Sequence, residues 1–138
     1  MGRPSRKKKM RVLIADDSLV VVERMVDILE PIRGLELIGW ASDIPEAEQS
    51  IERLNPDVVI LDLQVSKGRG LDMLRAVKQG RPSTAVIVIS NFPYPQYRQR
   101  CLDAGADFFL DKSTDFQKIP EILEQLLDNS LVGTPPRV

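Results

Sequence analysis

Short hydrophobic runs alternate along this chain with stretches in which apolar residues recur at helical spacing. The runs are rich in branched aliphatic residues, which is typical of strands buried on both faces of a parallel sheet. They predict strands over residues 11–15, 35–41, 58–61, 85–89 and 107–110. The stretches between them predict helices over 19–29, from Ser42 or Asp43 to about 54, from 71 to about 80, from 95 or 96 to 103, and from between 114 and 119 to about 127.

Turn and capping residues set the limits of these elements. Ser18 is placed to cap the first helix, and residues 64–69 are expected to form a loop after the third strand. Pro93 and Pro95 predict irregular backbone before the fourth helix, because proline lacks a donor and biases its predecessor away from helix. Pro120 is tolerable only in the first turn of the last helix.

The repeated strand and helix pattern predicts an α/β fold with a central parallel sheet and helices on both faces, since crossovers between parallel strands are right-handed. The chain has 138 residues, of which 43% are hydrophobic, enough for one core and one domain. We assign that domain to residues 10–128. Residues 1–9 are interpreted as a basic flexible arm, and residues 129–138 as a tail or a linker cut before another domain.

The net charge of −1 and the 28% of charged residues favour neither nucleic-acid nor membrane binding. The basic arm is interpreted as a solvated tail, although it has the charge to contact phosphates or anionic lipid. The single cysteine, Cys101, excludes an intrachain disulfide and fits a reducing compartment such as the cytoplasm. The apolar segment 12–15 is too short for a signal peptide or a membrane span. The chain has no histidine, so acid/base or phosphoryl chemistry must use other side chains or a metal.

Polar side chains follow four of the predicted strands at the points where those strands end. Asp16 and Asp17 follow the first strand, Asp62 the third, Ser90 the fourth and Lys112 the fifth. The carboxyl ends of parallel strands form the crevice in which open α/β sheets bind ligands. Each residue taken alone fits a cap, a turn or a surface lysine, whereas a single site accounts for all of them.

Three carboxylates brought together repel one another and raise their own pKa values unless a cation joins them. Mg²⁺ is the expected ion, because oxygen ligands suit it and it neutralises an incoming phosphoryl group. Lys112 then provides a charge for one phosphoryl oxygen and Ser90 a hydroxyl donor for another, which leaves Asp62 as the nucleophile. This set of residues predicts in-line phosphoryl transfer onto an aspartate.

Four motifs in the chain carry a specific resemblance: residues 13–18 (LIADDS), 56–63 (PDVVILDL), 88–90 (VIS) and 104–112 (AGADFFLDK). Together they resemble the receiver domains of the two-component response regulators, over about residues 10–128. The resemblance implies a three-layer, doubly wound (βα)5 flavodoxin-like fold with a five-stranded parallel sheet of order 2-1-3-4-5. Shorter similarities, such as Asp111-Lys112-Ser113, point to the nitrate-regulator branch.

The resemblance also implies roles for the acidic residues. Asp62 is implied to accept a phosphoryl group from a histidine kinase or a histidine phosphotransfer protein. Mg²⁺ is implied to be bound by Asp17, Asp62 and the backbone carbonyl of Gln64, with Asp16 helping through water. The domain is then a signalling receiver that catalyses its own phosphorylation and dephosphorylation, and not an enzyme acting on an external substrate.

A switch is implied for the remaining site residues. Ser90 and Lys112 are implied to hold the phosphoryl group, and Phe109 falls at the family's switch aromatic. Phosphorylation is implied to change the face formed by the fourth helix, the fifth strand and the last helix, which binds partners and can form a homodimer. Phe109 is also a physically reasonable core residue.

The chain departs from the family pattern at several positions. Val65-Ser66 replaces the usual Met-Pro, Ser113 replaces a frequent proline, and Phe109 lacks the hydroxyl of a common tyrosine. Two prolines lie in residues 91–95, where the family's signal leaves the site. The rival interpretation is a Mg²⁺-dependent phosphohydrolase that uses Asp62 on an external phosphate ester, but the chain offers no extra acid/base group and no phosphate-binding glycine loop.

Overall fold

Five parallel strands form one sheet in the order β2-β1-β3-β4-β5 in the computed structural model, which describes residues 9–132. This order confirms the expected doubly wound topology, because β2 is added on one side of β1 and the later strands β3, β4 and β5 on the other. The crevice between β1 and β3 lies at the carboxyl ends of the two strands. The strands are β1 Met10–Ala15, β2 Leu35–Ala41, β3 Val58–Asp62, β4 Ala85–Ser90 and β5 Phe108–Asp111.

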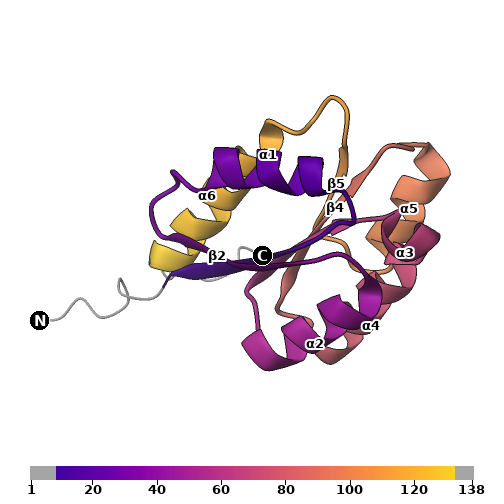
Figure 1. Ribbon diagram of the computed structural model, residues 1–138, viewed down its shortest axis with the longest axis horizontal. Helices are drawn as coiled ribbons and strands as arrows, with labels where there is room; N and C mark the ends of the chain where they lie inside the picture. Colours follow the sequence, from indigo (N-terminus) through magenta and orange to yellow (C-terminus); the bar gives the residue numbers. More distant parts are fainter. Residues whose placement is uncertain (1–8, 133–138) are drawn as a thin grey trace, which may run out of the picture.

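Helices cover both faces of the sheet, so the fold has the three expected layers. Helices α1 and α6 pack on one face, and α2, α4 and α5 on the other (Figure 1). The helices are α1 Leu19–Leu29, α2 Ile44–Leu54, α3 Val65–Gly68, α4 Gly70–Gly80, α5 Pro95–Asp103 and α6 Lys118–Val132.

The central strand β3 contributes to both halves of the core. Val59 and Leu61 point into the cluster under α2 and α4, whereas Val58 and Ile60 point into the cluster under α1 and α6. All five residues of β3 are buried. A strand whose side chains alternate between two buried faces needs apolar residues in succession, which is why β3 reads as an unbroken apolar run up to Asp62.

Capping residues place the helices as their sequence positions predict. The Ser18 hydroxyl accepts from the backbone N–H of Val21, and the Asp43 carboxylate accepts from that of Glu46 at 2.8 Å. The second helix is therefore capped by Asp43. Pro120 lies in the first turn of α6, where its missing N–H costs no helical hydrogen bond.

Some predicted boundaries were wrong. Residues 64–69 are not a plain loop but contain the short α3 turn, in which Ser66 and Lys67 have positive φ angles of 51° and 60°. Strand β5 begins one residue later than predicted, at Phe108. Helix α6 continues to Val132, so residues 129–132 belong to a helix and not to a tail, because its apolar periodicity runs past Leu127. Residues 1–8 of the predicted arm over 1–9, and residues 133–138 of the predicted tail, lie outside the described residues.

Strand β2 carries an irregularity that the hydrophobic pattern did not reveal. Val12 of β1 pairs with Leu37, but the next residue, Leu13, pairs with Gly39. Ile38 is therefore an extra residue on β2, a β-bulge, and the remainder of the strand is shifted by one position. Trp40 consequently lies opposite Ile14, near the carboxyl end of β1.

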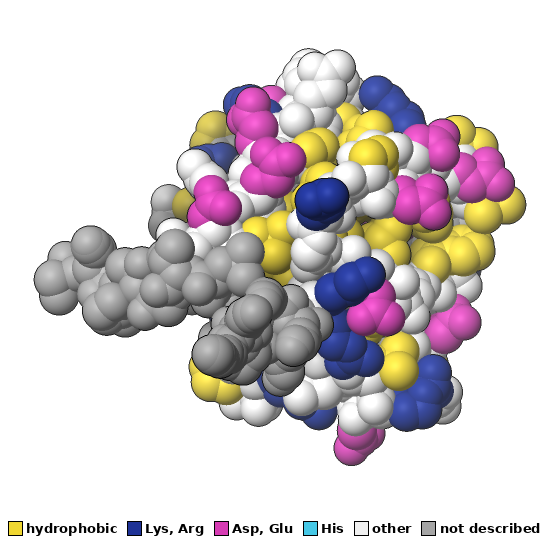
Figure 2. Space-filling view, turned by 90° about the vertical axis from the view of Figure 1, so that its left-hand side faces the viewer, with side chains coloured by type: hydrophobic (Ala, Val, Ile, Leu, Met, Phe, Trp, Pro, Cys, Tyr) yellow, Lys and Arg dark blue, Asp and Glu magenta, His cyan; other side chains and the backbone are white. Residues whose placement is uncertain are grey.

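The surface shows no strong preference for one sign of charge on the face drawn in Figure 2, where acidic and basic side chains are spread over apolar surface. Such mixing is expected for a chain with a net charge of −1. Within residues 9–132 no helix has the length and apolar character needed to cross a membrane.

Candidate functional site

Three carboxylates meet at the carboxyl edge of the sheet, where β1 and β3 end. Asp16, Asp17 and Asp62 each offer an oxygen, and these oxygens lie within 4.8 Å of one another. Asp16 and Asp62 are buried, whereas Asp17 is exposed. The sequence prediction that these three residues converge is confirmed by this arrangement.

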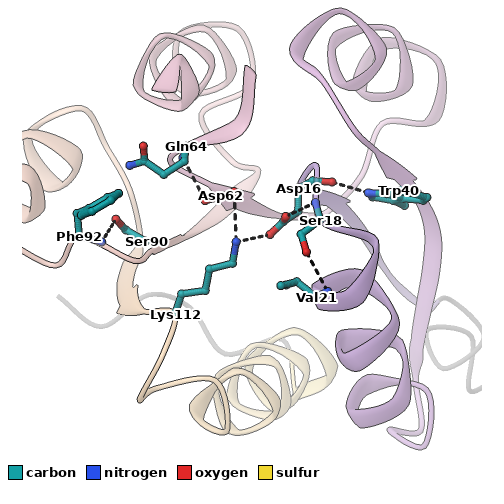
Figure 3. Close-up of polar contacts among 9 residues, drawn as sticks. All are labelled: Asp16, Ser18, Val21, Trp40, Asp62, Gln64, Ser90, Phe92 and Lys112. Carbon is teal, nitrogen blue, oxygen red and sulfur yellow. Dashed lines mark hydrogen bonds and ion pairs between the residues drawn. The ribbon is translucent and has the colours of Figure 1, made fainter. Parts of the chain in front are cut away.

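The backbone around Asp16 is held by contacts from three directions. Its N–H donates to the carbonyl of Ala41 at 3.0 Å, and its carboxylate Oδ1 accepts from the N–H of Ser18 at 2.8 Å. The indole Nε1–H of Trp40 donates to the Asp16 carbonyl at 2.6 Å (Figure 3). The first acidic residue of the pair therefore has little freedom to turn away from the site.

Asp62 and Lys112 form the centre of the site. The Lys112 ammonium lies 3.0 Å from Oδ2 of Asp16 and 3.3 Å from Oδ2 of Asp62 (Figure 3). The two aspartates are buried, and the lysine side chain is 9% exposed. Oδ1 of Asp62 accepts from the N–H of Gln64 at 3.1 Å. The N–H of Lys112 donates to the carbonyl of Ser90 at 2.8 Å, which fixes the lysine to the end of β4.

Burial and charge act in opposite directions on these groups. Burial raises the pKa of Asp62, and the nearby Asp16 adds to the rise, while the Gln64 N–H and Lys112 partly offset it. For Lys112, burial works against the charged form, but its hydrogen bond to Asp16 and the charge of Asp62 outweigh burial and raise its pKa. The lysine is therefore a firmly charged ammonium between two carboxylates.

The residues present fit a hard divalent cation. Oδ2 of Asp16 is buried, and within the described part of the chain its polar contact is the Lys112 ammonium at 3.0 Å. Asp17 provides an exposed oxygen nearby, open to water, and Mg²⁺ favours carboxylates together with retained waters. A buried Asp16 oxygen next to a solvent-accessible Asp17 oxygen provides the kind of ligands that such an ion binds.

The carbonyl of Gln64 is oriented by the left-handed turn that follows it. Ser66, Lys67 and Gly68 all have positive φ angles, and the N–H of Gly68 donates to the Gln64 carbonyl at 3.0 Å. A carbonyl has a second lone pair, so this bond leaves a site for a ligand. Gly70 lets the turn close, because a Cβ there would lie 2.6 Å from the carbonyl of Leu63.

Ser90 and Phe109 lie on neighbouring strands beside this centre. Ser90 is fully buried, and its hydroxyl oxygen accepts from the N–H of Phe92 at 2.9 Å (Figure 3). Phe109 is buried on β5, beside Val88 of β4, in the core under α4 and α5. The guanidinium of Arg98 lies 5.9 Å from the centre of its ring and donates to its carbonyl at 3.3 Å. Phe109 is thus an inward-facing core residue in this structure.

Residues 12–124 match the protein family described as the response regulator receiver domain. The chain belongs to this family. Among solved structures, this receiver domain is similar to the signal receiver domain of NarL from Mycobacterium tuberculosis, with 27% identity, a TM-score of 0.79 and coverage of 88% of this chain and 98% of that one. It is also similar to the response regulator domain of CheB from Thermotoga maritima, with 25% identity, a TM-score of 0.76 and coverage of 94% and 100%.

Sequence relatives of the receiver domain include a protein-glutamate methylesterase/protein-glutamine glutaminase of Geobacter sulfurreducens. It is 38% identical over 107 residues, which cover 78% of this chain and 29% of the relative. The chain thus spans less than a third of that protein's length. Since the similar proteins include both methylesterases and NarL, the nitrate-regulator placement stays a prediction.

Two residues that shape the receiver site were not found from the sequence. Trp40 contacts Asp16 in the register that the bulge at Ile38 sets. The Ser66 hydroxyl accepts from the N–H of Ile44 at 2.9 Å and ties the turn after β3 to the start of α2. A partial signal existed for Trp40, because a tryptophan just before a strand end needs a partner for its indole N–H.

Proposed function

We propose that this receiver domain is a phosphorylation-controlled switch in which Asp62 accepts a phosphoryl group from a histidine kinase or a histidine phosphotransfer protein. The observation that carries the proposal is the buried triad of Asp16, Asp62 and Lys112, with 3.0 Å and 3.3 Å contacts from the ammonium to the two carboxylates. Removing three ionisable groups from water at a sheet edge costs folding free energy. This cost favours a role in binding and transferring a phosphoryl group over a purely structural role.

In the proposed transfer, the Asp62 carboxylate forms a bond to phosphorus while the donor's phosphorus–nitrogen bond breaks and the donor imidazole keeps the electron pair. Lys112 then exchanges a carboxylate contact for a phosphoryl oxygen. Asp16, Asp17, Asp62 and the Gln64 carbonyl would hold Mg²⁺. The ion would supply neutralisation of the incoming phosphoryl charge.

The alternative is a phosphohydrolase that turns over external phosphate esters. Within the described residues, the titratable groups at the site are the three carboxylates and Lys112, and these leave no separate acid for an ester leaving group. We therefore expect the protein to take up one phosphoryl group per chain from acetyl phosphate, only with Mg²⁺, and to leave p-nitrophenyl phosphate intact. Mass spectrometry and a colorimetric assay measure the two outcomes. Repeated turnover of the ester would favour the phosphohydrolase.

We further propose that phosphorylation changes the face formed by α5, β5 and α6, through which partners or a second copy bind. Residues 91–100 are all exposed, and Cys101 is the buried residue of α5. Helix α5 therefore has little of its surface committed to the core, and elements with few buried contacts shift most readily. The buried thiol fits the reducing cytoplasm, where we place the protein.

Ser90→Ala should break the link between phosphorylation and this face. The hydroxyl of Ser90 connects the site to the N–H of Phe92 at the start of the exposed segment, so its loss removes one differential contact between the two states. Phosphoryl uptake should persist, because Asp62 and Lys112 remain. In the beryllofluoride complex, backbone NMR shifts over residues 91–112 should stay close to those of the free protein, a loss of coupling of about 1 to 3 kcal/mol.

Ser90→Thr is the matched control, because it keeps a hydroxyl at the same position. It should show the full set of shifts through Phe109 and α5. Equal shifts in wild type and Ser90→Ala would mean that another route carries the signal.

A further inference from the structure

Trp40 owes its position to the bulge in β2. Without an extra residue at Ile38, the register Val12↔Leu37 would place Ile38 opposite Leu13 and Gly39 opposite Ile14. The bulge instead brings Trp40 opposite Ile14, one residue before Ala41 reaches the end of the strand pair. Bulges beside functional sites commonly redirect one side chain, and here the redirected side chain is an indole whose N–H reaches the end of β1.

The indole binds the peptide group that joins the two acidic residues. The carbonyl of Asp16 belongs to the same planar unit as the N–H of Asp17, so the 2.6 Å bond from Trp40 sets the orientation of that unit. The other side of Asp16 is held by Ala41, through the 3.0 Å bond to the Asp16 N–H. Asp17 itself is exposed, and no hydrogen bond holds its side chain within the described residues. Its direction therefore depends on the backbone that Trp40 holds.

We propose that Trp40 is a positioning residue for the divalent-cation site, in that its indole N–H fixes the Asp16–Asp17 peptide so that the Asp17 carboxylate faces Asp62. This inference rests on the proposed function, since it assumes that the three carboxylates bind Mg²⁺. A simpler role, in which Trp40 only covers the edge of the sheet, fits less well. The side chain is 38% exposed, and the Asp16 carbonyl is a polar partner that mere coverage does not require.

Trp40→Phe separates the two roles, because phenylalanine keeps an aromatic ring but has no N–H to donate. We expect the Mg²⁺ dissociation constant of the metal-free protein, measured by calorimetry, to rise about 3- to 10-fold, as loss of one hydrogen bond predicts. Phosphoryl uptake from acetyl phosphate should slow at limiting Mg²⁺ and return to the wild-type rate at saturating Mg²⁺. A role in packing alone would lower the melting temperature without this dependence on the ion.

Ser42→Ala is the matched control, because it removes one side-chain donor just after the same strand, where the Ser42 hydroxyl donates to Glu46 at 3.2 Å and not to the acidic site. Its Mg²⁺ affinity should equal that of wild type. Equal affinities in Trp40→Phe and wild type would overturn the inference while leaving the proposed function intact, whereas a wild-type protein that binds no Mg²⁺ would overturn both.

A measurement on the unmodified chain covers the case in which Trp40→Phe does not fold. Trp40 is the only tryptophan, so the protein gives a single indole N–H signal in a proton–nitrogen NMR spectrum. That proton should exchange slowly with water, and its signal should move on addition of Mg²⁺ in wild type but not in Asp17→Asn. A rapidly exchanging indole proton, or a signal that Mg²⁺ does not move, would contradict the assigned role.

Discussion

Asp62→Asn should reduce Mg²⁺-dependent phosphoryl uptake from acetyl phosphate by at least about 10³-fold, a loss typical of removing a nucleophile. Asparagine keeps the shape of the side chain and its acceptor for the Gln64 N–H, but its amide does not attack phosphorus. The fold should persist because the substitution is isosteric and removes a buried charge. Intact-protein mass spectrometry measures the uptake, and circular dichroism verifies the fold.

Asp57→Asn provides a control at the opposite end of the same strand. Asp57 immediately precedes β3, and its carboxylate accepts from the N–H of Arg11 at 2.8 Å, far along the strand from the site. Uptake in this variant should remain close to that of wild type. Undiminished labelling of Asp62→Asn would show that the phosphoryl group resides elsewhere.

Lys112→Met should lower the free energy of unfolding by about 3 kcal/mol in metal-free buffer, because it leaves two buried carboxylates without their cation. The side chains of Asp16, Asp62 and Lys112 are each less than a tenth exposed, so water offers little compensation. Urea unfolding in the presence of a chelator measures the change. Lys118→Met is the matched control, since Lys118 pairs with Asp115 at 3.3 Å on the surface, and it should change stability by less than about 1 kcal/mol.

The loss of stability in Lys112→Met should depend on pH, and the titration of Asp62 sets the direction of that dependence. Because burial raises the pKa of Asp62 above its ordinary value, the folded protein holds that proton more tightly than the unfolded chain. The contribution of this group to stability is therefore greatest below the ordinary aspartate pKa and falls as pH rises through the folded value. Removing the cation should raise the pKa of Asp62 in the folded protein further, so that this fall extends to higher pH. Adding Asp62→Asn to Lys112→Met should recover part of the lost stability, and a double variant no more stable than Lys112→Met would contradict this explanation.

In the metal-free protein, substituting Asp17 and substituting Asp62 should change stability by different amounts. Asp62→Asn should relieve much more charge repulsion than Asp17→Asn. The Asp62 carboxylate is buried beside Asp16, whereas the Asp17 carboxylate is exposed. Water screens the exposed charge and keeps its contribution small. The sequence alone predicts the same effect for both substitutions, because charge at a position says nothing about its burial.

The sequence by itself determined the order of elements and which polar residues meet at the candidate site. Hydrophobic periodicity is a local property, so the amino-acid pattern alone predicts the alternation of strands and helices, the buried run of β3 and the caps at Ser18 and Asp43. The convergence of Asp16, Asp62 and Lys112 followed from topology alone, because parallel strands bring their carboxyl ends to one edge.

Only the tertiary structure decided how those residues contact one another. The bulge at Ile38 is a property of strand pairing, and the hydrogen bond from Trp40 forms in the register that the bulge sets. The left-handed turn at Ser66 is joined to a distant helix, because the Ser66 hydroxyl accepts from the N–H of Ile44. The burial that raises the pKa of Asp62 arises from layers packed on both sides of the sheet. The hydrophobic pattern along the chain specifies which face of a strand or helix a residue occupies. Strand register, burial and charge pairing instead arise from contacts between segments far apart in the chain. Those contacts give the acidic site its geometry.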